Sequence, residues 1–312
     1  MLFRSNDTAT TEIYTVSDTL SLHDALPIYV APDSVMTWSQ PGQFRLDAVG
    51  RPAMLAGVPP DYFSADGQLW GNPLYNWDQA QRDGFAFWRA RLAQQLRRFD
   101  IVRIDHFRGL AAYWAVPALA SSAREGHWEP APGHALFRAL RADHPWLPLV
   151  AEDLGLITPD VEELRHAFGL PGMRVLQFGF DGSSDNPHLP HNYPLDVVAY
   201  TGTHDNDTTL GWYRSLGPQE AARVDFYLRS DAAHVLEAML RATLSSVAQL
   251  AILSVQDLLQ LGSEARFNTP GTSQGNWHWR LPPGSLSAAL AGQFAALNRI
   301  FGRSGGAPAG AR

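Results

Sequence analysis

The chain has 312 residues, of which 45% are hydrophobic and 18% are charged, and its formal net charge is −7. This balance is typical of a globular protein and excludes wholesale disorder, while the absence of a basic stripe argues against a nucleic-acid partner. The sequence has no cysteine, which excludes disulfides, thiolate metal ligands and a thiol nucleophile. Its longest apolar stretch, around 250–255, is well short of the roughly 20 residues that a membrane span needs, so we expect no membrane partner.

Residues 5–28 differ in composition from the rest of the chain. They are rich in Thr, Ser and Asp, and they lack the basic start and apolar centre of a secretory signal. The string SNDTATTEIYT…SLHDALPI resembles translated sequencing-adapter DNA joined to a gene near Tyr29, and a disordered N-terminal arm is the alternative. We therefore expect residues 1–28 to be foreign or disordered. Resequencing of the source DNA across the join tests this hypothesis.

From Tyr29 onward, short apolar runs alternate with helical patterns, which is typical of βα units in a parallel sheet or barrel. The apolar runs predict strands at 100–105, 148–152, 173–180, 197–203 and 250–255. Apolar residues at helical spacing and an N-terminal Thr-Pro signal predict helices at 83–98, from 158 onward, at 236–247 and near 286–301. We expect one catalytic domain over 29–303 and a disordered Gly/Ala/Ser tail at 304–312.

Two long segments, 57–77 and 262–280, combine Gly, Pro, Asn and aromatic residues, and we expect both to be loops. Loops of this length inside a compact domain are usually functional. The chain also has 10 Trp and 15 Phe residues, whose flat faces can pack cores or stack on sugar rings.

Acidic residues stand at the ends of three predicted strands. Asp105, Glu152 and Asp205 are each about one βα unit apart. Because the C-terminal strand ends of a (β/α)-barrel meet on one face, the three carboxylates could converge there. Carboxylates gathered around one bond are what glycoside chemistry needs, since one attacks the anomeric carbon and a second, with a raised pKa, protonates the leaving oxygen.

Other interpretations of these acids stay open. A single acidic residue at a strand end is most often a helix N-cap or lies in a solvated turn. A metal site is an alternative because Asp, Glu and His are suitable ligands, but no His-x-His or His-Glu-x-x-His spacing supports it. A serine triad, which needs a nucleophile elbow between a strand and a helix, is a weaker alternative.

At these residues the sequence resembles the 4-α-glucanotransferases known as amylomaltases or disproportionating enzymes, glycoside hydrolase family 77, over about 26–280. The matching stretches are IYVAPDS (28–34), GVPPDYFSADGQLWGNPLY (57–75), VRIDHFRG (102–109), AEDLG (151–155), TGTHDNDT (201–208) and GNW (275–277). The α-amylases share the barrel and the three acids but not the 57–75 segment. The resemblance implies an α/β fold that is an incomplete (β/α)8 TIM barrel of the α-amylase type, roughly strands 3 to 8, with long active-site loops.

The resemblance also implies a role for each acid. Asp105 matches the nucleophile, Glu152 the general acid/base and Asp205 the stabiliser of the transition state. Arg103, two residues earlier on the same strand face, would keep Asp105 ionised. The substrate-binding residues that the resemblance implies are Arg103, His204, Ser34, Tyr62, Phe63, Trp70 and Asn206. The alternatives are a strand-end ion pair for Arg103 and a core histidine for His204.

The 57–75 segment resembles the lid that covers the acceptor side in this family. Tyr62, Phe63 and Trp70 would then stack on sugar rings and screen the glycosyl-enzyme from water, which favours transfer over hydrolysis. The alternative is that these rings pack the segment onto the barrel.

Two departures from the family pattern affect what we expect of this chain. Family members carry Gly-Asp directly before Leu-Pro-Ile, whereas this chain has Asp24-Ala25, and a one-residue slip turns strand side chains to the opposite face. The first two βα units of the barrel are also absent. Since an open barrel exposes strand edges, we expect poor folding or aggregation and little activity.

The sequence thus predicts that the parent protein is a cytoplasmic α-1,4-glucan transferase that uses no cofactor and no metal. Its expected partners are maltooligosaccharides, amylose and glucose as acceptor. An α-amylase-like hydrolase is the closest alternative, and release of glucose equivalents without longer products would favour it. A non-catalytic glucan-binding fragment is a third possibility, which amylose binding unchanged by Asp105→Asn would support.

Overall fold

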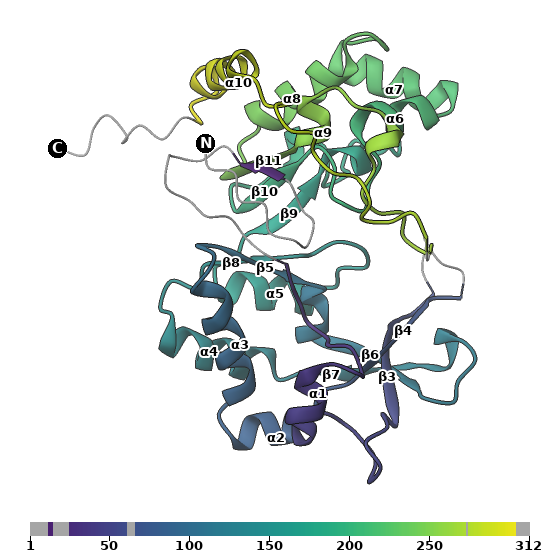
Figure 1. Cartoon of the computed structure of the whole chain (residues 1–312), viewed down its shortest axis with the longest axis vertical. Coiled ribbons are helices and arrows are strands. Elements are labelled where there is room, and N and C mark those ends of the chain that lie inside the picture. The colour runs from purple at the N-terminus through teal and green to yellow at the C-terminus, as the bar shows by residue number, and fades with distance from the viewer. Residues whose placement is uncertain (1–11, 15–24, 61–65, 273, 304–312) are drawn as a thin grey trace, which may run out of the picture. The chain divides into compact units, whose positions relative to one another are not determined.

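The computed structural model of the chain describes residues 12–14, 25–60, 66–272 and 274–303. It forms two compact units, which we call the first unit (21–172) and the second unit (1–20 and 173–312), and Figure 1 labels their elements. The division between the two units falls at residue 173, and the single catalytic domain over 29–303 stays a prediction.

The first unit holds a parallel sheet, an antiparallel sheet and five α-helices among the described residues. Its strands are β2 (Ala25–Pro27), β3 (Met54–Val58), β4 (Gln68–Pro73), β5 (Val102–Asp105), β6 (Ala112–Pro117), β7 (His127–Pro130) and β8 (Leu149–Ala151). Its helices are α1 (Val35–Ser39), α2 (Trp77–Arg82), α3 (Ala86–Leu96), α4 (Gly133–Asp143) and α5 (Pro159–Ala167), with 3-10 turns η1 (Pro41–Gln43), η2 (Phe107–Leu110) and η3 (Ala123–Glu125).

The parallel sheet has the order β2-β5-β8, with β5 in the centre. Its strands form from short apolar runs, and Val102, Ile104 and Leu149 are buried, as expected where helices cover a parallel sheet. Helices α3, α4 and α5 share one apolar core with these strands. Because the three strands are parallel, their C-terminal ends lie at one edge, where Asp105 ends β5 and Glu152 follows β8.

Strand β2 places residues 25–28 inside this core. Leu26 and Ile28 are buried, and Pro27 lies opposite Asp105 in the register with β5. The guanidinium of Arg91 donates to the carbonyl oxygens of Pro27 at 2.8 Å and Ile28 at 3.2 Å. The boundary predicted at residue 29 therefore falls inside the first unit, and residues 25–28 contribute to its fold.

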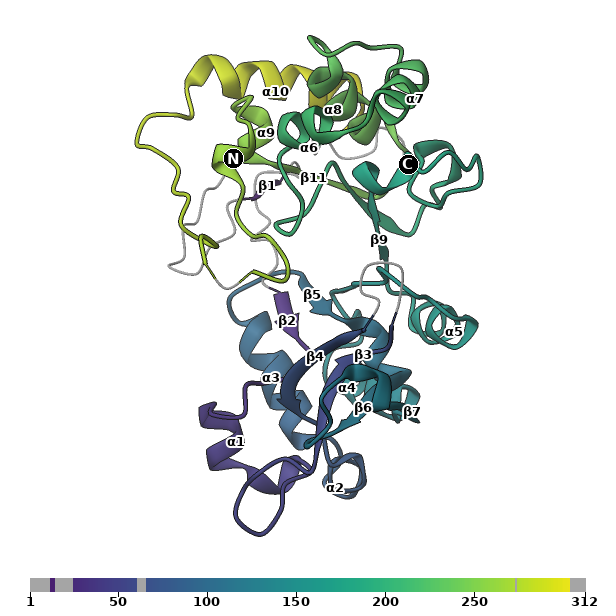
Figure 2. The same cartoon turned by 90° about the vertical axis from the view of Figure 1, so that its right-hand side faces the viewer.

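The antiparallel sheet has the order β4-β3-β6-β7, and Figure 2 labels its four strands. The sequence predicted a loop over 57–77. In the structure, residues 57 and 58 belong to β3, residues 68–73 form β4 and Trp77 begins α2. That prediction is wrong in extent because β3 finds a second partner: it pairs with β4 on one side and β6 on the other. Strands β3, β6 and β7 were not predicted, since their pairing partners are distant in sequence.

The second unit is an α/β layer built on the sheet β1-β11-β10-β9. Its strands are β1 (Glu12–Tyr14), β9 (Gly172–Val175), β10 (Val197–Tyr200) and β11 (Leu250–Ser254); β10 and β11 are parallel and β1 is antiparallel to β11. Its helices are α6 (Thr209–Ser215), α7 (Pro218–Leu228), α8 (Val235–Ser245), α9 (Val255–Leu258) and α10 (Ala288–Ile300), with turns η4 (Leu176–Gly179), η5 (Pro190–Asn192) and η6 (Ser263–Ala265).

One expectation about the second unit needs correction. The strand predicted over 173–180 ends at Val175, and the rest is the 3-10 turn η4, whose Leu176 nevertheless stays buried. An apolar run alone cannot separate these two cases. Residues 12–14, within the segment predicted to be foreign or disordered, form β1 against β11, and the foreign origin of that segment stays a prediction.

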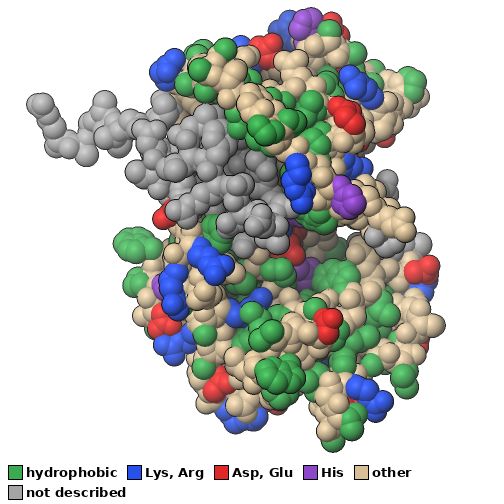
Figure 3. Space-filling model, viewed as in Figure 1, with side chains coloured by type: hydrophobic (Ala, Val, Ile, Leu, Met, Phe, Trp, Pro, Cys, Tyr) green, Lys and Arg blue, Asp and Glu red, His purple; other side chains and the backbone are tan. Residues whose placement is uncertain are grey.

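Large apolar side chains remain exposed in both units. Trp38 and Trp146 in the first unit are 83% and 93% exposed, and Phe226 in the second is 89% exposed. Figure 3 shows hydrophobic side chains interspersed with charged ones over the visible face. Within the described residues, no helix is both long enough and apolar enough to span a membrane.

Candidate active site

Asp105 ends β5 with its carboxylate held by an arginine of the same strand. Side chains two residues apart on a strand share a face, and Nη2 of Arg103 lies 2.7 Å from Oδ1 of Asp105. The Arg103 side chain is only 8% exposed, whereas that of Asp105 is 42% exposed. The predicted ion pair is therefore present, with the cation below the surface and the carboxylate open to an incoming group.

Glu152 lies beside this pair, immediately after β8. Its Oε2 accepts the backbone N–H of His106 at 2.7 Å, and its Oε1 accepts that of Leu154 at 3.0 Å. Loss of solvent around the carboxyl group, assisted by the negative charge of Asp105, raises the pKa of Glu152 to about 7, although Arg103 and the two N–H groups oppose the rise. A carboxyl group with this pKa can both give and take a proton near neutrality.

His106 is a site residue that the sequence analysis missed. Its backbone is left-handed, with φ of 56°, an uncommon conformation for a residue other than glycine. This conformation directs its N–H toward Glu152. Burial lowers the pKa of the His106 imidazole to about 4, so the ring is neutral at pH 7. The available signal was its place in the sequence between Asp105 and a buried turn, which secondary-structure propensities do not use.

Aromatic rings surround the His106 side chain. The ring of Trp70, on β4, packs edge to face against the His106 ring, with ring centroids 4.7 Å apart. The ring centroids of Tyr29 and Trp70 are 6.1 Å apart. Trp70 is 36% exposed, so part of its ring is free to contact another molecule. Tyr62 and Phe63, which the sequence placed in the same lid, lie outside the described residues.

Ser34 caps a helix in the first unit. It is the N-cap of α1, where its Oγ accepts the backbone N–H of Thr37 at 3.2 Å and lies 3.0 Å from the Thr37 hydroxyl. Such caps satisfy helix N–H groups that have no partner within the helix. Substrate binding by Ser34 stays a prediction.

Asp205 belongs to the second unit, in the segment between β10 and α6. Nδ2 of Asn268 donates to its Oδ1 at 2.6 Å, and Nη2 of Arg266 donates to its backbone oxygen at 2.8 Å. His204 Nε2 lies 3.5 Å from the same Oδ1. The sequence analysis missed Asn268 and Arg266, although both lie in the predicted 262–280 loop. The Asn268 amide orients the half-exposed carboxylate of Asp205, while the Arg266 guanidinium holds the Asp205 backbone.

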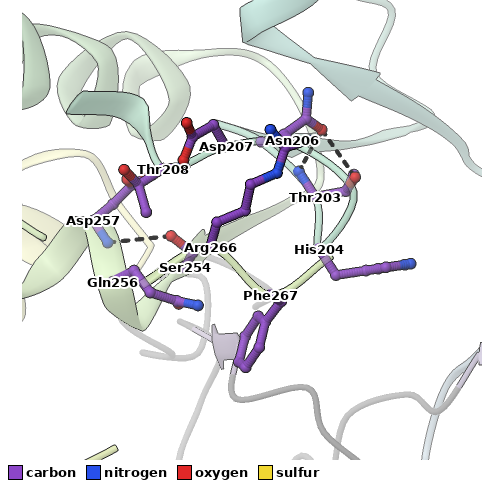
Figure 4. Close-up of a pocket in the computed structure, with 11 residues that line it drawn as sticks. Thr203, His204, Asn206, Asp207, Thr208, Ser254, Gln256, Asp257, Arg266 and Phe267 are labelled. Atoms are coloured by element: carbon purple, nitrogen blue, oxygen red, sulfur yellow. Dashed lines mark hydrogen bonds between the residues drawn. The ribbon is translucent and has the colours of Figure 1, made fainter. Parts of the chain in front are cut away.

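The turn that carries Asp205 is stabilised by its own side chains, as Figure 4 shows. Oδ1 of Asn206 accepts both the N–H and the hydroxyl of Thr203, each at 2.9 Å. Trp277 packs against the His204 ring with centroids 5.4 Å apart. Asn206, predicted to bind substrate, therefore shapes the turn, and its amide nitrogen points away from these bonds in the close-up.

The structure thus assembles two groups of the predicted residues, one in each unit. Arg103, Asp105, Glu152 and Trp70 gather at the sheet edge of the first unit, while His204, Asp205 and Asn206 occupy one turn of the second.

Two alternative kinds of site, a serine triad and a metal centre, find no support in the geometry. One Gly-x-Ser-x-Gly string does occur, at 271–275, but its serine lies outside the described residues, and no described strand directly precedes the string as a nucleophile elbow requires. Among the described residues, no group of three or more His, Cys, Asp or Glu side chains is arranged to hold a metal ion.

Comparison with known proteins identifies the family. The 4-α-glucanotransferase family profile matches residues 5–287, and the chain belongs to this family. The match begins inside the segment that resembles adapter sequence, whose foreign origin stays a hypothesis.

Two relatives illustrate the similarity. The chain is 55% identical to the 4-α-glucanotransferase of Thermus thermophilus over 270 residues, covering 84% of this chain and 54% of the relative. It is 49% identical to that of Synechocystis over 288 residues, covering 91% of this chain and 57% of the relative. The chain therefore spans about half the length of the curated relatives it matches.

A solved structure is consistent with this family assignment. The amylomaltase of Streptococcus agalactiae, determined in complex with acarbose, superimposes with a TM-score of 0.87 at 38% identity. The match covers 91% of this chain and 58% of that one. The α/β fold with parallel strands and helices is therefore that of an amylomaltase.

Proposed function

We propose that the chain carries the catalytic groups of a 4-α-glucanotransferase that moves α-1,4-glucan segments by a retaining double displacement. The observation that carries this proposal is the pair of unlike carboxyl groups in the first unit. Asp105 is held by the buried Arg103, whereas the pKa of Glu152 is raised to about 7. Two carboxyl groups whose environments differ in this way suit a nucleophile and an acid/base.

In the first half-reaction, Asp105 attacks the anomeric carbon of the donor glucan and forms a glycosyl ester. Glu152 gives its proton to the glycosidic oxygen, which leaves as the hydroxyl of the released segment. In the second half-reaction, Glu152 takes the proton from a hydroxyl of the acceptor sugar. That oxygen then attacks the anomeric carbon, and Asp105 leaves as a carboxylate. The configuration at the anomeric carbon is retained because it inverts twice.

We assign Asp205 to the sugar hydroxyls of the distorted ring, with His204 beside it. The hydrogen bond from Asn268 supports this role, because it leaves one carboxylate oxygen of Asp205 fixed and the other available. Arg103, Ser34, Tyr62, Phe63, Trp70 and Asn206 complete the proposed substrate contacts. Among these, the partly exposed ring of Trp70 has the support of its position against His106.

The proposed substrates are maltooligosaccharides and amylose, with glucose as an acceptor, and no nucleic acid or membrane is involved. Acarbose in the Streptococcus agalactiae amylomaltase supports this substrate class. A cytoplasmic location stays a prediction, as does catalysis without a cofactor.

We further propose that the strands correspond to strands 3 to 8 of a (β/α)8 barrel. In chain order, β2, β5, β8, β9, β10 and β11 would be those six strands, and helices or helical turns connect them. The coverage of 58% of the Streptococcus agalactiae chain supports an incomplete barrel. We therefore keep the prediction that the chain is weakly active and self-associates, and the exposed Trp38 and Trp146 support it. Light scattering that shows only monomers would contradict this prediction.

Incubation of the purified chain with maltotriose tests the proposed activity. Disproportionation predicts glucose together with maltotetraose and longer products, all of which disappear in Asp105→Asn. Glucose and maltose without longer products would identify the alternative, an α-amylase-like hydrolase. Amylose binding that persists in Asp105→Asn, with no products from either chain, would leave the non-catalytic glucan binder.

A further inference from the structure

Asp257 is a buried carboxylate that no step of the proposed reaction uses. It lies in α9, directly beyond β11, and is 2% exposed. Three donors surround it at 2.8 Å: the hydroxyl of Thr201, the hydroxyl of Thr209 and the backbone N–H of Thr209. Burial raises the pKa of Asp257, while these hydrogen bonds oppose the rise.

The two threonines stand at the two ends of the Asp205 turn. Thr201 directly follows β10, and Thr209 is the first residue of α6. Residues 202–208 connect them and carry His204, Asp205 and Asn206. The Asp257 carboxylate therefore binds both ends of the turn. Asp257 itself lies at the junction of β11 and α9, about 50 residues further along the chain.

Two further hydrogen bonds hold the 202–208 turn in place. The Asp207 side chain accepts the Ser263 hydroxyl at 2.6 Å, and the Asp207 carbonyl accepts Nε2 of Gln177 at 3.0 Å. A Cβ on Gly211 would overlap the Ser263 hydroxyl, so these groups are closely packed. Figure 4 shows Asp257, Ser254, Thr208 and Asp207 around one small pocket beneath the turn.

We propose that Asp257 is a positioning residue that fixes the 202–208 turn and thereby the place of the Asp205 carboxylate. Its effect on catalysis rests on the proposed role of Asp205, but its effect on the turn does not. Asp257 contacts no substrate in the proposed reaction. It acts through Thr201 and Thr209, because a carboxylate can accept several hydrogen bonds at once and so join groups that cannot bond to each other.

Hydrogen exchange of the intact chain tests this inference. The backbone N–H groups of Thr203, Asn206 and Thr208 are hydrogen-bonded within the turn and report on its order. Asp257→Ala should speed their exchange by about tenfold, the effect of losing one to two net hydrogen bonds that close the turn. The amides of α8 should keep their protection, since no hydrogen bond of Asp257 reaches that helix.

Thr243→Val is the matched control. Thr243 is fully buried in α8, and its hydroxyl donates to the Met239 carbonyl at 3.0 Å, away from the turn. This variant should destabilise the second unit without speeding exchange in the turn. Equal acceleration in both variants, or none in Asp257→Ala, would overturn the inference.

Two further measurements keep the inference testable should Asp257→Ala not fold. Thr209→Val keeps the side-chain shape and the backbone N–H but removes one hydroxyl, so a smaller acceleration confined to the turn is expected. Asp257→Asn retains one oxygen and should recover part of the protection. The His204 ring proton signals should shift in Asp257→Ala and Thr209→Val and stay unchanged in Thr243→Val. Unmoved His204 signals in all three variants would contradict a positioning role.

Since these readouts need no turnover, they separate this inference from the proposed function. An ordered turn that depends on Asp257, in a chain that makes no products from maltotriose, would support the inference and contradict the proposed activity. Products from maltotriose with a turn that is indifferent to Asp257 would do the reverse.

Discussion

The backbone N–H of His106 donates to Oε2 of Glu152 over 2.7 Å, so the residue that follows Asp105, the proposed nucleophile, directly contacts the proposed acid/base. The contact requires the left-handed backbone of His106, which costs about 1 kcal/mol or more in a residue that is not glycine. This hydrogen bond favours the ionised carboxylate and limits the rise in the Glu152 pKa that burial causes.

Substitutions at His106 should therefore distinguish the effect of its backbone N–H from the effect of its imidazole ring. His106→Gly keeps the N–H and accepts a positive φ, so the pKa of Glu152 should stay near 7. His106→Val places a β-branched residue in a conformation it disfavours, so the N–H should move away and the Glu152 pKa should rise by about one pH unit. Titration of the 13C-labelled Glu152 carboxyl by NMR measures both. Equal pKa values in the two variants would contradict the role of the backbone.

The pH dependence of turnover should follow Glu152. In the proposed mechanism the first half-reaction needs its proton, and the fraction of protonated Glu152 falls as pH rises through about 7. The rate of glycosyl-enzyme formation from maltotriose should therefore fall between about pH 6 and about pH 8. An α-glucosyl fluoride, whose leaving group needs no proton, should not show this loss. Parallel pH profiles for the two donors would exclude Glu152 as the acid.

The same group should affect stability with a defined sign. The folded pKa of Glu152 is raised above its unfolded value, so its contribution is fully present below the unfolded pKa and is lost as pH rises through about 7. The wild-type chain should lose about 3 kcal/mol between about pH 4 and about pH 8 from this group. Glu152→Gln has no such proton and should flatten that part of the curve. Denaturant unfolding at both pH values, followed by a first-unit tryptophan signal, measures the difference.

Asn268 should matter for turnover through Asp205. Asn268→Ala removes the 2.6 Å hydrogen bond to Oδ1 of Asp205, and we expect a rate with maltotriose that is lower by about 10- to 100-fold. Because this hydrogen bond orients a group that we propose acts in the transition state, the turnover rate should fall more than substrate affinity. Asn192→Ala, which removes hydrogen bonds to Ser184 and Asn186 elsewhere in the second unit, is the control. Equal losses in both variants would show a general effect on folding.

Residues 25–28 should be necessary for the first unit, whatever the origin of the segment. Deletion through residue 24 should leave the unit folded, because β2 and its anchors remain. Deletion through residue 28 removes Leu26 and Ile28 from the core and leaves buried Arg91 without the two carbonyl oxygens it binds. We expect loss of cooperative unfolding in the longer deletion, measured by circular dichroism. Identical unfolding curves would contradict the assignment of β2.

The sequence predicted the parts of this fold that depend on local patterns. The strand over 100–105 and the helix over 83–98 correspond to β5 and α3, because apolar spacing reports burial directly. The sheet β4-β3-β6-β7 was missed because its strands become stable only by pairing with segments far along the chain. The end of β9 at Val175 was missed for a similar reason, since a buried 3-10 turn has the same composition as a strand.

The same distinction applies to the candidate site: contacts between residues close in sequence were predictable, and contacts between distant residues were not. Asp105 and Arg103 are two residues apart on one strand, so their contact could be predicted from the pleat alone. The hydrogen bond from Asn268 to Asp205 and the hydrogen bonds of Asp257 join segments about 50 to 60 residues apart, and no local pattern indicates them. The N–H of His106 was missed because main-chain donors leave no mark on the side-chain sequence.

Trapping the covalent intermediate is the most direct test of Asp105 as the nucleophile. In Glu152→Gln, an α-maltotriosyl fluoride can still glycosylate Asp105, whereas the acceptor step is slowed by loss of the base. Mass spectrometry of the digested chain should then find one maltotriosyl group on the peptide that contains Asp105, and none in the double variant Asp105→Asn/Glu152→Gln. A glycosyl group on another residue, or its persistence in the double variant, would contradict Asp105 as the nucleophile.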